Sequence, residues 1–270
     1  MTREDSPLPS TRRAALITGA SAGIGAAFGR HLAAEGYDVL LVARRAERLE
    51  ELATELHHQH SVRAEVFAAD LTDPAAPAAI TSRATELGLP IDVLINNAGL
   101  SASTKFSDTP WESVAGELQL MVTAVTELIH RAIPGMKQRR WGRIINLSSL
   151  AAVSPPGEGL LYTGIKSYAL NMSQSLDMEL KPHGIHVTAL CPGFTHSEFH
   201  DVMGTRDVAD RLPGFMWQQP EPVVREGWAA VNDGKPVCIP GTVNKLTAAA
   251  IRPVPQRIQY FLGRTFNPFK

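Results

Sequence analysis

Short runs of aliphatic and β-branched residues recur along the chain, and each is followed by a longer segment whose apolar residues repeat at helical spacing. The short runs are apolar at consecutive positions, which is typical of strands buried on both faces of a sheet. Strands that alternate with helices without a break in composition form a parallel sheet with helices on both faces. The sequence therefore predicts an α/β fold, a single doubly wound parallel sheet of about seven strands.

The expected elements follow this alternation from residue 14 onward. The predicted strands cover residues 14–18, 38–42, 63–68, 93–96, 143–147, 186–190 and 237–239. The predicted helices cover residues 24–35, 46–58, 74–86, 111–138, 161–181 and 222–232.

The chain is expected to form one large domain without an internal repeat or linker. This domain spans residues 14–253 and follows a flexible N-terminus at 1–13. Within it, residues 194–220 lose the alternating pattern and are rich in His, Met, Gly, Pro and aromatic residues, which predicts an irregular lid. The C-terminal tail at 254–270 is basic and aromatic, and we expect it to pack loosely or against a partner subunit.

Composition and charge favour a small-molecule partner over nucleic acid or a membrane. The 270 residues are 44% hydrophobic and 20% charged, as in ordinary globular proteins, and the formal net charge of −1 gives no attraction to nucleic acid. The chain has no apolar run of the roughly 18 to 20 residues that a membrane helix needs, and its polar N-terminus is not a secretory signal. Cys191 and Cys238 lack CxxC spacing, so we interpret them as core residues of a cytoplasmic protein.

A glycine-rich turn, TGASAGIG at residues 18–25, follows the first predicted strand and leads into the first predicted helix. Glycine lets a backbone approach a pyrophosphate, and the free amides and dipole of a helix N-terminus favour its negative charge. A plain tight connection between strand and helix is the alternative. The residues expected to bind a dinucleotide here are Gly19, Ser21, Gly23, Ile24 and Gly25.

The same turn contains the G-x-S-x-G pattern of a serine hydrolase elbow, centred on Ser21. An elbow serine needs an oxyanion hole that is supplied in part by an earlier strand-to-helix loop. Only residues 1–13 precede the first predicted strand, so the sequence favours a dinucleotide site over a hydrolase.

Two arginines, rather than a carboxylate, follow the second predicted strand. In NAD-selective versions of such folds an acidic residue here accepts hydrogen bonds from the ribose 2′-hydroxyl. Arg44 and Arg45 stand at this place, and the Arg44 guanidinium could clamp a 2′-phosphate and stack on adenine. The sequence therefore predicts NADP(H) as the cofactor. The alternative is a solvated basic helix start, although cations are unfavourable at a helix N-terminus.

Tyr162 and Lys166 form a candidate proton-transfer pair. They are four residues apart in a predicted helix, so their side chains are expected on one face. Ionising a free phenol at pH 7 costs roughly 4 kcal/mol, which a neighbouring ammonium reduces. Tyr162 could then exchange a proton with a carbonyl or alcohol oxygen, and Ser149, just past the fifth strand, could bond the same oxygen.

Taken together, these motifs resemble the short-chain dehydrogenase/reductase family over residues 14–241. The turn at 18–25, the Asn-Asn-Ala-Gly sequence at 96–99 and the trio Ser149, Tyr162 and Lys166 match that family's cofactor turn, NNAG motif and catalytic residues. The resemblance implies a Rossmann fold, NADP(H), hydride transfer between a ketone and a secondary alcohol with Tyr162 as general acid and base, and a homodimer or homotetramer. It further implies that the cofactor is bound by Arg44, Asp70, Leu71, Asn97, Ala98, Gly99, Tyr162, Lys166, Pro192, Gly193 and Thr195.

Met121 departs from the family pattern. The family usually places an asparagine there, in the long crossover helix before the serine, where it anchors a water of the proton relay. Either the relay uses another water site or turnover is slow. A cofactor-binding scaffold or sensor with little turnover is therefore a second hypothesis, against which the intact Ser149, Tyr162 and Lys166 argue.

The substrate side is expected to be apolar. Residues 154–159 precede the candidate tyrosine, and the lid is rich in aromatic side chains, which suits a lipid-like, steroid-like or aryl ketone. The ending KPVCIPG at 235–241 also resembles a bacterial subgroup that includes reductases of long-chain β-keto acyl groups. The lid residues expected to contact the substrate are Phe199, Phe215, Met216 and Trp217.

The histidines do not predict a metal site. His57, His58 and His60 crowd a helix end without carboxylate or cysteine partners at ligand spacing. His196 and His200 flank Glu198, but not in the order of a zinc protease. We expect no bound metal, and surface positions for these side chains.

Overall fold

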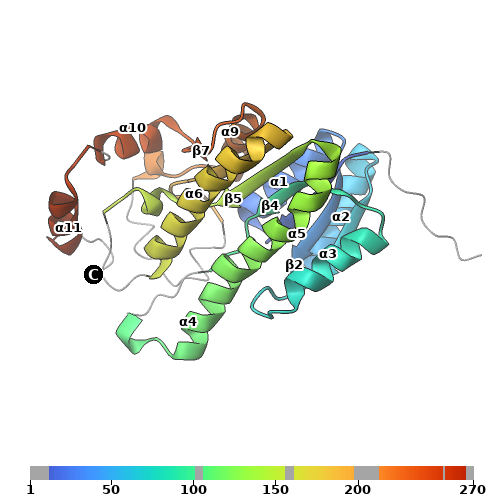
Figure 1. The fold of residues 1–270 in the computed structure, drawn as a ribbon, viewed down its shortest axis with the longest axis horizontal. Helices are drawn as coiled ribbons and strands as arrows, with labels where there is room; N and C mark the ends of the chain where they lie inside the picture. Colours follow the sequence, from blue (N-terminus) through green and yellow to red (C-terminus); the bar gives the residue numbers. More distant parts are fainter. Residues whose placement is uncertain (1–11, 101–105, 156–160, 198–212, 252, 266–270) are drawn as a thin grey trace, which may run out of the picture.

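The computed structural model describes residues 12–100, 106–155, 161–197, 213–251 and 253–265. Its core is one seven-stranded parallel sheet in the order β3-β2-β1-β4-β5-β6-β7, with helices on both faces (Figure 1). The predicted doubly wound α/β fold is confirmed. The strands are β1 (Ala14–Thr18), β2 (Asp38–Ala43), β3 (Ala64–Ala68), β4 (Ile91–Asn96), β5 (Gly142–Leu147), β6 (Ile185–Leu190) and β7 (Val237–Cys238).

Every predicted strand and helix is present, and its ends lie within two residues of the prediction. The helices along the chain are α1 (Gly23–Ala34), α2 (Ala46–His60), α3 (Ala76–Glu86), α4 (Trp111–Leu118), α5 (Ala124–Arg139), α6 (Leu161–Leu180), α9 (Pro220–Asn232), α10 (Thr242–Ile251) and α11 (Gln256–Thr265).

β3 departs from the expectation that all strands are apolar and buried on both faces. Its residues are only half-buried or exposed, and Glu65 within it pairs with Arg63 at 2.7 Å. The reason is position, because β3 is the edge strand and pairs only with β2. An edge strand tolerates charge, which also protects its free side from pairing with other chains.

The helix predicted at 111–138 contains a π-helical segment, η2 (Gln119–Thr123), between α4 and α5. Such segments insert one extra residue into a helical turn and often lie at functional sites. η2 contains neither proline nor glycine, so nothing in its sequence marked the irregularity. It buries Leu120 and Met121 against the sheet.

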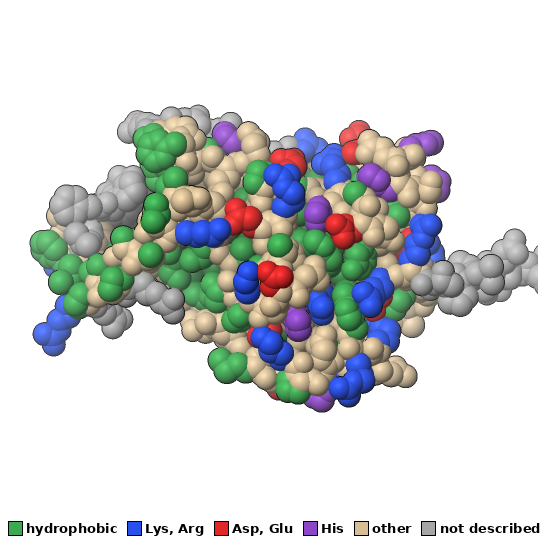
Figure 2. Space-filling view, turned by 90° about the horizontal axis from the view of Figure 1, so that it is seen from above, with side chains coloured by type: hydrophobic (Ala, Val, Ile, Leu, Met, Phe, Trp, Pro, Cys, Tyr) green, Lys and Arg blue, Asp and Glu red, His purple; other side chains and the backbone are tan. Residues whose placement is uncertain are grey.

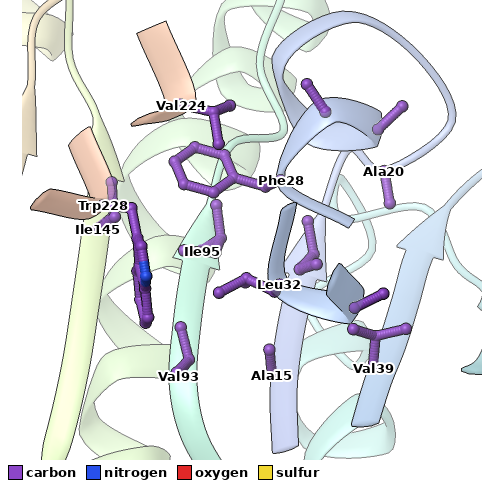
Figure 3. Close-up of a cluster of buried hydrophobic side chains, with 14 of the residues drawn as sticks. Ala15, Ala20, Phe28, Leu32, Val39, Val93, Ile95, Ile145, Val224 and Trp228 are labelled. Atoms are coloured by element: carbon purple, nitrogen blue, oxygen red, sulfur yellow. The ribbon is translucent and has the colours of Figure 1, made fainter. Parts of the chain in front are cut away.

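Two hydrophobic clusters, one on each face, attach the helices to the sheet. On one face, Phe28 and Leu32 of α1 pack with Trp228 of α9 over Ile95 of β4 (Figure 3). On the other face, α3, α5 and α6 pack on the same strands through a second cluster that includes Ile80, Leu128 and Ile165. Fully burying each such side chain contributes roughly 1.5–3 kcal/mol to the stability of the fold. The two clusters therefore hold the helices firmly on the sheet and support the loops at its ends.

β1 and β4 are neighbouring parallel strands at the centre of the sheet. The chain continues from β1 toward one edge of the sheet and from β4 toward the other, so the strand order reverses between them. In open α/β sheets, ligands bind in the crevice outside the carboxyl ends of the strands at such a switch point. The glycine turn follows β1, and the NNAG motif ends β4, so the fold brings both to this crevice.

Two helices that the sequence did not predict, α10 and α11, follow β7 (Figure 1). They leave large apolar side chains exposed, among them Leu246, Tyr260 and Phe261. Figure 2 shows hydrophobic side chains gathered toward this end of the molecule, whereas charged side chains of both signs are dispersed over the rest of that face. No helix in the described part of the chain combines the length and hydropathy needed to cross a bilayer.

Candidate functional site

The glycine turn is held in place by residues at the end of β4. Asn97 Nδ2 donates to the carbonyl oxygens of Thr18 and Gly19 at 3.0 and 3.1 Å. The backbone amides of Asn97 and Ala98 both donate to Thr18 Oγ1, at 3.0 and 3.1 Å. Asn97 and Ala98 thus fix the turn, which gives the NNAG motif a structural role beside the proposed cofactor contacts.

The turn has the close backbone packing that excludes side chains. Gly19 adopts φ +67°, and a Cβ on it would lie 2.6 Å from Asn97 Nδ2. A Cβ on Gly25 would overlap the carbonyl oxygen of Gly19. α1 begins at Gly23, which also has positive φ and whose Cβ would lie 2.7 Å from Ser197 Cβ. The glycine turn therefore packs closely against the segment after β6, to which Ser197 belongs.

Ser21 lies in this turn and accepts hydrogen bonds from Arg45 Nε and Nη2 at 3.3 and 2.9 Å. A guanidinium stays protonated in proteins and cannot act as the base that a hydrolase serine requires. The geometry therefore gives no support to the hydrolase alternative. It also identifies Arg45, which the sequence analysis did not select, as a cation beside the turn.

Arg44 and Asp70 lie near each other at the ends of β2 and β3. Arg44 Nη1 is 3.9 Å from Asp70 Oδ2, and both side chains are largely exposed. The Thr72 amide and hydroxyl donate to Asp70 Oδ1, and these bonds, with Arg44, hold the pKa of the Asp70 carboxyl below its usual value. Leu71, next in the chain, is buried. An exposed polar rim with one charge of each sign suits the adenosine end of a nucleotide.

Ser148 and Ser149, at the end of β5, have different partners. Ser148 Oγ is buried and donates to the backbone oxygen of Lys166 at 2.7 Å. Ser149 Oγ accepts from the amide of Ala151 at 3.1 Å, and its side chain is hydrogen-bonded to that of Tyr162. The structure therefore brings Ser149, rather than Ser148, to the candidate tyrosine.

Lys166 is a buried cation in α6, about one helical turn after Tyr162. Its Nζ donates to the Leu147 carbonyl oxygen at 2.7 Å and lies 5.3 Å from the centroid of the Tyr162 ring. Burial lowers the pKa of Lys166 from 10.5 to about 8, against a smaller opposing effect of Cys191. Tyr162 and Lys166 share one helix face, as their spacing predicted.

The pKa of Tyr162 differs from the expectation. Burial raises it from 10.0 to about 12, the hydrogen bond with Ser149 lowers it, and Cys191 raises it. The predicted lowering by the neighbouring ammonium does not dominate, because the loss of solvation around the phenol is the largest effect on its pKa. Tyr162 is thus protonated at neutral pH, the state from which it can donate a proton.

Residues after β6 close the site on its other side. The Leu150 amide donates to the Pro192 carbonyl oxygen at 2.9 Å, which joins the loops after β5 and β6. Gly193 packs against Asn244 of α10, which lies 2.5 Å from where a Cβ would stand. Thr195 is buried, and its hydroxyl donates to the Gly193 oxygen at 3.2 Å. Ile24 is half-buried and packs on the core beneath the glycine turn.

Gly99 follows Asn97 and Ala98, the two residues after β4 that hold the glycine turn, and lies beside the candidate lysine. A Cβ on Gly99 would lie 3.5 Å from Met121 Sδ and 3.8 Å from Lys166 Nζ. The π segment η2 thus brings Met121, the position that departs from the family pattern, into this neighbourhood.

Part of the predicted substrate side is present. Trp217 packs against Phe194, with ring centroids 5.7 Å apart, and stacks on His196 at 4.7 Å. His196 is exposed, as expected for a surface position, and also stacks on Trp217 within the lid. Phe215 is 70% exposed and Met216 half-buried. Phe199, His200 and residues 156–159 lie outside the described residues.

Cys191 and Cys238 are both buried, as predicted. Burial raises the pKa of the Cys191 thiol to about 11 and that of Cys238 to about 12, so both are neutral at physiological pH.

A dinucleotide fits the donor set at this crevice. Glycines at 19, 23 and 25 leave the backbone bare where side chains would collide, and the N-terminus of the twelve-residue α1 adds free amides. Arg44 and Arg45 supply positive charge at the end of β2. Ser149, which follows β5, supplies a hydrogen-bonding hydroxyl. Tyr162 and Lys166 of α6 supply an acid and an ammonium.

Comparison with known proteins agrees with this geometry. The family model described as short chain dehydrogenase matches residues 13–206. The serine 3-dehydrogenase of Agrobacterium fabrum is 33% identical over 204 residues, which cover 73% of this chain and 78% of that protein.

Two solved structures share the fold over most of their length. One is a short-chain dehydrogenase from Sphingobium yanoikuyae in complex with NADPH, with a TM-score of 0.79, 32% identity and coverage of 90% of this chain and 96% of that one. The other is the bulky-bulky ketone specific alcohol dehydrogenase from Comamonas testosteroni, with a TM-score of 0.73, 28% identity and coverage of 92% and 96%.

Proposed function

The chain belongs to the short-chain dehydrogenase family, and we propose that it transfers a hydride between NADP(H) and an apolar ketone or secondary alcohol. The nicotinamide, when bound, supplies or accepts the hydride. The contribution of the protein is to bind the two reactants side by side and to move one proton to or from the substrate oxygen.

One observation carries this proposal: the side chains of Ser149, Tyr162 and Lys166 meet at the carboxyl end of β5. Ser149 is hydrogen-bonded to Tyr162, and Lys166 Nζ lies 5.3 Å from the Tyr162 ring. The three come from two segments that the fold joins at the ligand-binding edge of the sheet. A buried ammonium beside a half-buried phenol is typical of a functional site rather than of the packing of a sheet.

In the reducing direction, Tyr162 donates its phenolic proton to the substrate oxygen as negative charge develops on it. Ser149 donates a hydrogen bond to the same oxygen and shares that charge. The resulting phenolate is costly at this buried position, since the pKa of Tyr162 is about 12. The ammonium of Lys166 offsets part of this cost through its positive charge. In the oxidising direction the ionised Tyr162 accepts the proton of the alcohol, while Ser149 and Lys166 keep the same roles.

The residues that would hold the cofactor are distributed along the crevice. The turn at Gly19, Gly23 and Gly25 would hold the pyrophosphate, and Asp70 with Leu71 the adenine. Asn97, Ala98, Gly99, Pro192, Gly193 and Thr195 would border the nicotinamide half, and Lys166 would bond its ribose.

Selectivity for NADP(H) is proposed from the two arginines after β2. Arg44 is largely exposed, and Arg45 is anchored to Ser21 in the glycine turn. Together they offer two guanidiniums to a 2′-phosphate where NAD-selective folds offer a carboxylate. The NADPH complex of the Sphingobium relative supports this proposal.

The apolar substrate class is proposed from the lid. Phe194 and Trp217 pack against each other on the segment after β6, and Phe215 of the same segment is exposed. The Comamonas relative, whose name specifies bulky ketones, supports this class, whereas the name of the Agrobacterium relative specifies a small amino acid. The domain limits 14–253, the lid at 194–220, the tail at 254–270 and a homodimer or homotetramer remain proposals.

The direct test combines binding with turnover. Purified protein is titrated with NADPH and with NADH, and nicotinamide absorbance is then followed with a panel of aryl, steroid and long-chain ketones beside serine and small sugars. We expect tighter binding of NADPH and oxidation of NADPH by at least one apolar ketone. Tight NADPH binding without turnover of any panel member would instead indicate a scaffold or sensor.

A further inference from the structure

A small cavity lies next to Lys166, between the ends of β4 and β5, the π segment η2 and α6. Its volume is about 10 Å³, the least space that can hold one water molecule. Asn96, Asn146 and Lys166 contribute polar groups to its lining, and Met121 contributes a thioether. The rest of the lining is aliphatic or backbone.

A row of hydrogen bonds leads from α6 to this cavity, and its direction is fixed at the far end. Ser173 Oγ donates its one proton to the Ala169 carbonyl oxygen at 2.6 Å. It can therefore only accept from Asn146 Nδ2, at 3.0 Å. This orients the Asn146 amide so that its Oδ1 accepts from Asn96 Nδ2 at 2.8 Å. Each amide determines the orientation of the next.

The last member of the row is left with an unused acceptor. Asn96 is 4% exposed, and its Oδ1 has no hydrogen-bond partner among the described residues. Asn96 cannot satisfy this oxygen by rotating its amide, because its Oδ1 would then face Asn146 Oδ1 and two acceptors would oppose each other. Buried acceptors of this kind are normally satisfied by protein or by an ordered water.

Lys166 offers the complementary group on the same cavity. An ammonium has three donors, and one of them is used by the Leu147 carbonyl oxygen at 2.7 Å. Met121 brings only a weakly accepting sulfur, so it does not compete strongly for the others. A water in the cavity can accept from Lys166 Nζ and donate to Asn96 Oδ1.

We infer that this cavity is a binding site for one structural water, held between Asn96 Oδ1 and Lys166 Nζ. Asn96 acts as a positioning residue, since through the water it solvates the buried ammonium. The inference rests on the proposed function only for the catalytic importance of Lys166; the water site itself depends on the hydrogen-bond row alone.

The charge of Lys166 depends on such solvation. Burial lowers its pKa to about 8, close to neutrality. The titratable groups nearest to it are Tyr162 on its own helix and Cys191 after β6, and both are neutral at pH 7. Neither supplies a negative charge, so a water in the cavity would add to the hydrogen bond with the Leu147 carbonyl oxygen in stabilising the ammonium.

The first test is crystallographic. A high-resolution structure of the full chain is expected to show density for one water within hydrogen-bond distance of both Asn96 Oδ1 and Lys166 Nζ. A dry cavity, or a direct contact between these two atoms, would overturn the proposal. This result is independent of any substrate or cofactor, so it separates failure of the water site from failure of the proposed function.

The second test measures the pKa of Lys166 by NMR of the protein with ¹³C-labelled lysine, with the signal assigned by its loss in Lys166→Met. We expect Asn96→Leu to lower this pKa by about one unit, the equivalent of one hydrogen bond to a charged group. Ser173→Ala, at the far end of the row, frees the amides to reorient and is expected to lower the pKa in the same direction by less.

Met121→Leu is the matched control, because it changes the cavity lining without removing an acceptor. The pKa of Lys166 should stay within a few tenths of a unit of that in the unsubstituted protein. If Asn96→Leu does not fold, Ser173→Ala carries the test alone. An unchanged pKa in Ser173→Ala and in any folded Asn96→Leu would contradict the role of Asn96.

Discussion

Ser148 and Ser149 are adjacent in sequence, yet Ser148 Oγ donates to the backbone oxygen of Lys166, whereas the Ser149 side chain is hydrogen-bonded to Tyr162. The first bond ties the end of β5 to α6, and the second lies among the proposed reacting groups. The two hydroxyls therefore differ in what their removal should change.

Replacing each serine by alanine separates structure from chemistry. Ser149→Ala is expected to lower kcat by roughly a hundredfold, because a hydrogen bond to the developing charge is lost, and to lower stability less than Ser148→Ala, since it removes only a part-buried bond from the Ala151 amide. Ser148→Ala is expected to lower the free energy of unfolding by roughly 1–2 kcal/mol, since the buried hydrogen bond between the Ser148 hydroxyl and the Lys166 carbonyl oxygen is lost. Urea unfolding and steady-state rates on both variants make the comparison. The reverse pattern would assign the catalytic role to Ser148.

Arg45 is expected to contribute to NADPH selectivity as well as Arg44. Arg45→Ala should raise the Kd of NADPH roughly tenfold to a hundredfold, the loss of charge-assisted bonds to a phosphate, and should change the Kd of NADH much less. Arg44→Asp should have the same sign and reverse the preference further. Binding is measured by nucleotide fluorescence titration.

Arg83→Ala is the control for general charge, because Arg83 is an exposed arginine that pairs with Glu86 on α3. Equal losses of NADPH and NADH affinity in Arg45→Ala would contradict a role at the 2′-phosphate and point to the glycine turn, which Arg45 contacts through Ser21.

The glycine turn should not tolerate a methyl group at Gly25. A Cβ there would overlap the Gly19 oxygen and lie 2.5 Å from Asn97 Nδ2, so the turn must open. Gly25→Ala is expected to abolish nucleotide binding and to lower the melting temperature. In the control Gly164→Ala, the new Cβ meets nothing within 4 Å, and stability should rise by up to about 1 kcal/mol. Normal NADPH affinity in Gly25→Ala would show that the turn does not hold the pyrophosphate.

The buried Lys166 should make stability depend on pH with a defined sign. Its pKa is about 8 in the folded protein and 10.5 as a free side chain, so between these values the unfolded chain holds the proton that the folded protein lacks. Stability then rises with pH through this window. From pH 7 to pH 9 this contribution amounts to about 1 kcal/mol.

Urea unfolding at pH 7 and pH 9, on the unsubstituted protein and on Lys166→Met, isolates this effect. The thiols of Cys191 and Cys238 have raised pKa values and lower the stability as pH rises above 9, but they are present in both proteins and largely cancel. The unsubstituted protein should gain stability relative to the variant as the pH rises. A loss, or no difference, would indicate that Lys166 is solvated like an exposed lysine.

The fold was predictable because its information is local. Strands such as β1 and β2 contain unbroken apolar runs, and their flanking helices have apolar residues at regular spacing. The π segment η2 could not be predicted, since it arises from how the long crossover helix packs on the sheet and not from a proline or glycine. The edge position of β3 likewise depends on strand order, which the sequence does not state.

The candidate site was predictable only where spacing or motif determines proximity. Tyr162 and Lys166 follow from one helix turn, and Ser149 from the family pattern. The contact of Arg45 with the glycine turn was missed, because the sequence does not show which of Arg44 and Arg45 points toward Ser21 after β2. Asn96 and Asn146 were missed as a pair because they are fifty residues apart and meet through the register of β4 and β5.

The most direct test of the account is a single-turnover measurement on Tyr162→Phe. NADPH-loaded protein is mixed with a ketone that the unsubstituted protein reduces, and nicotinamide absorbance is followed by stopped flow. We predict that Tyr162→Phe binds NADPH with nearly unchanged affinity but reduces the ketone at least about a hundredfold more slowly, the usual contribution of a general acid. Reduction at the unsubstituted rate in Tyr162→Phe would contradict the central claim that Tyr162 supplies the proton.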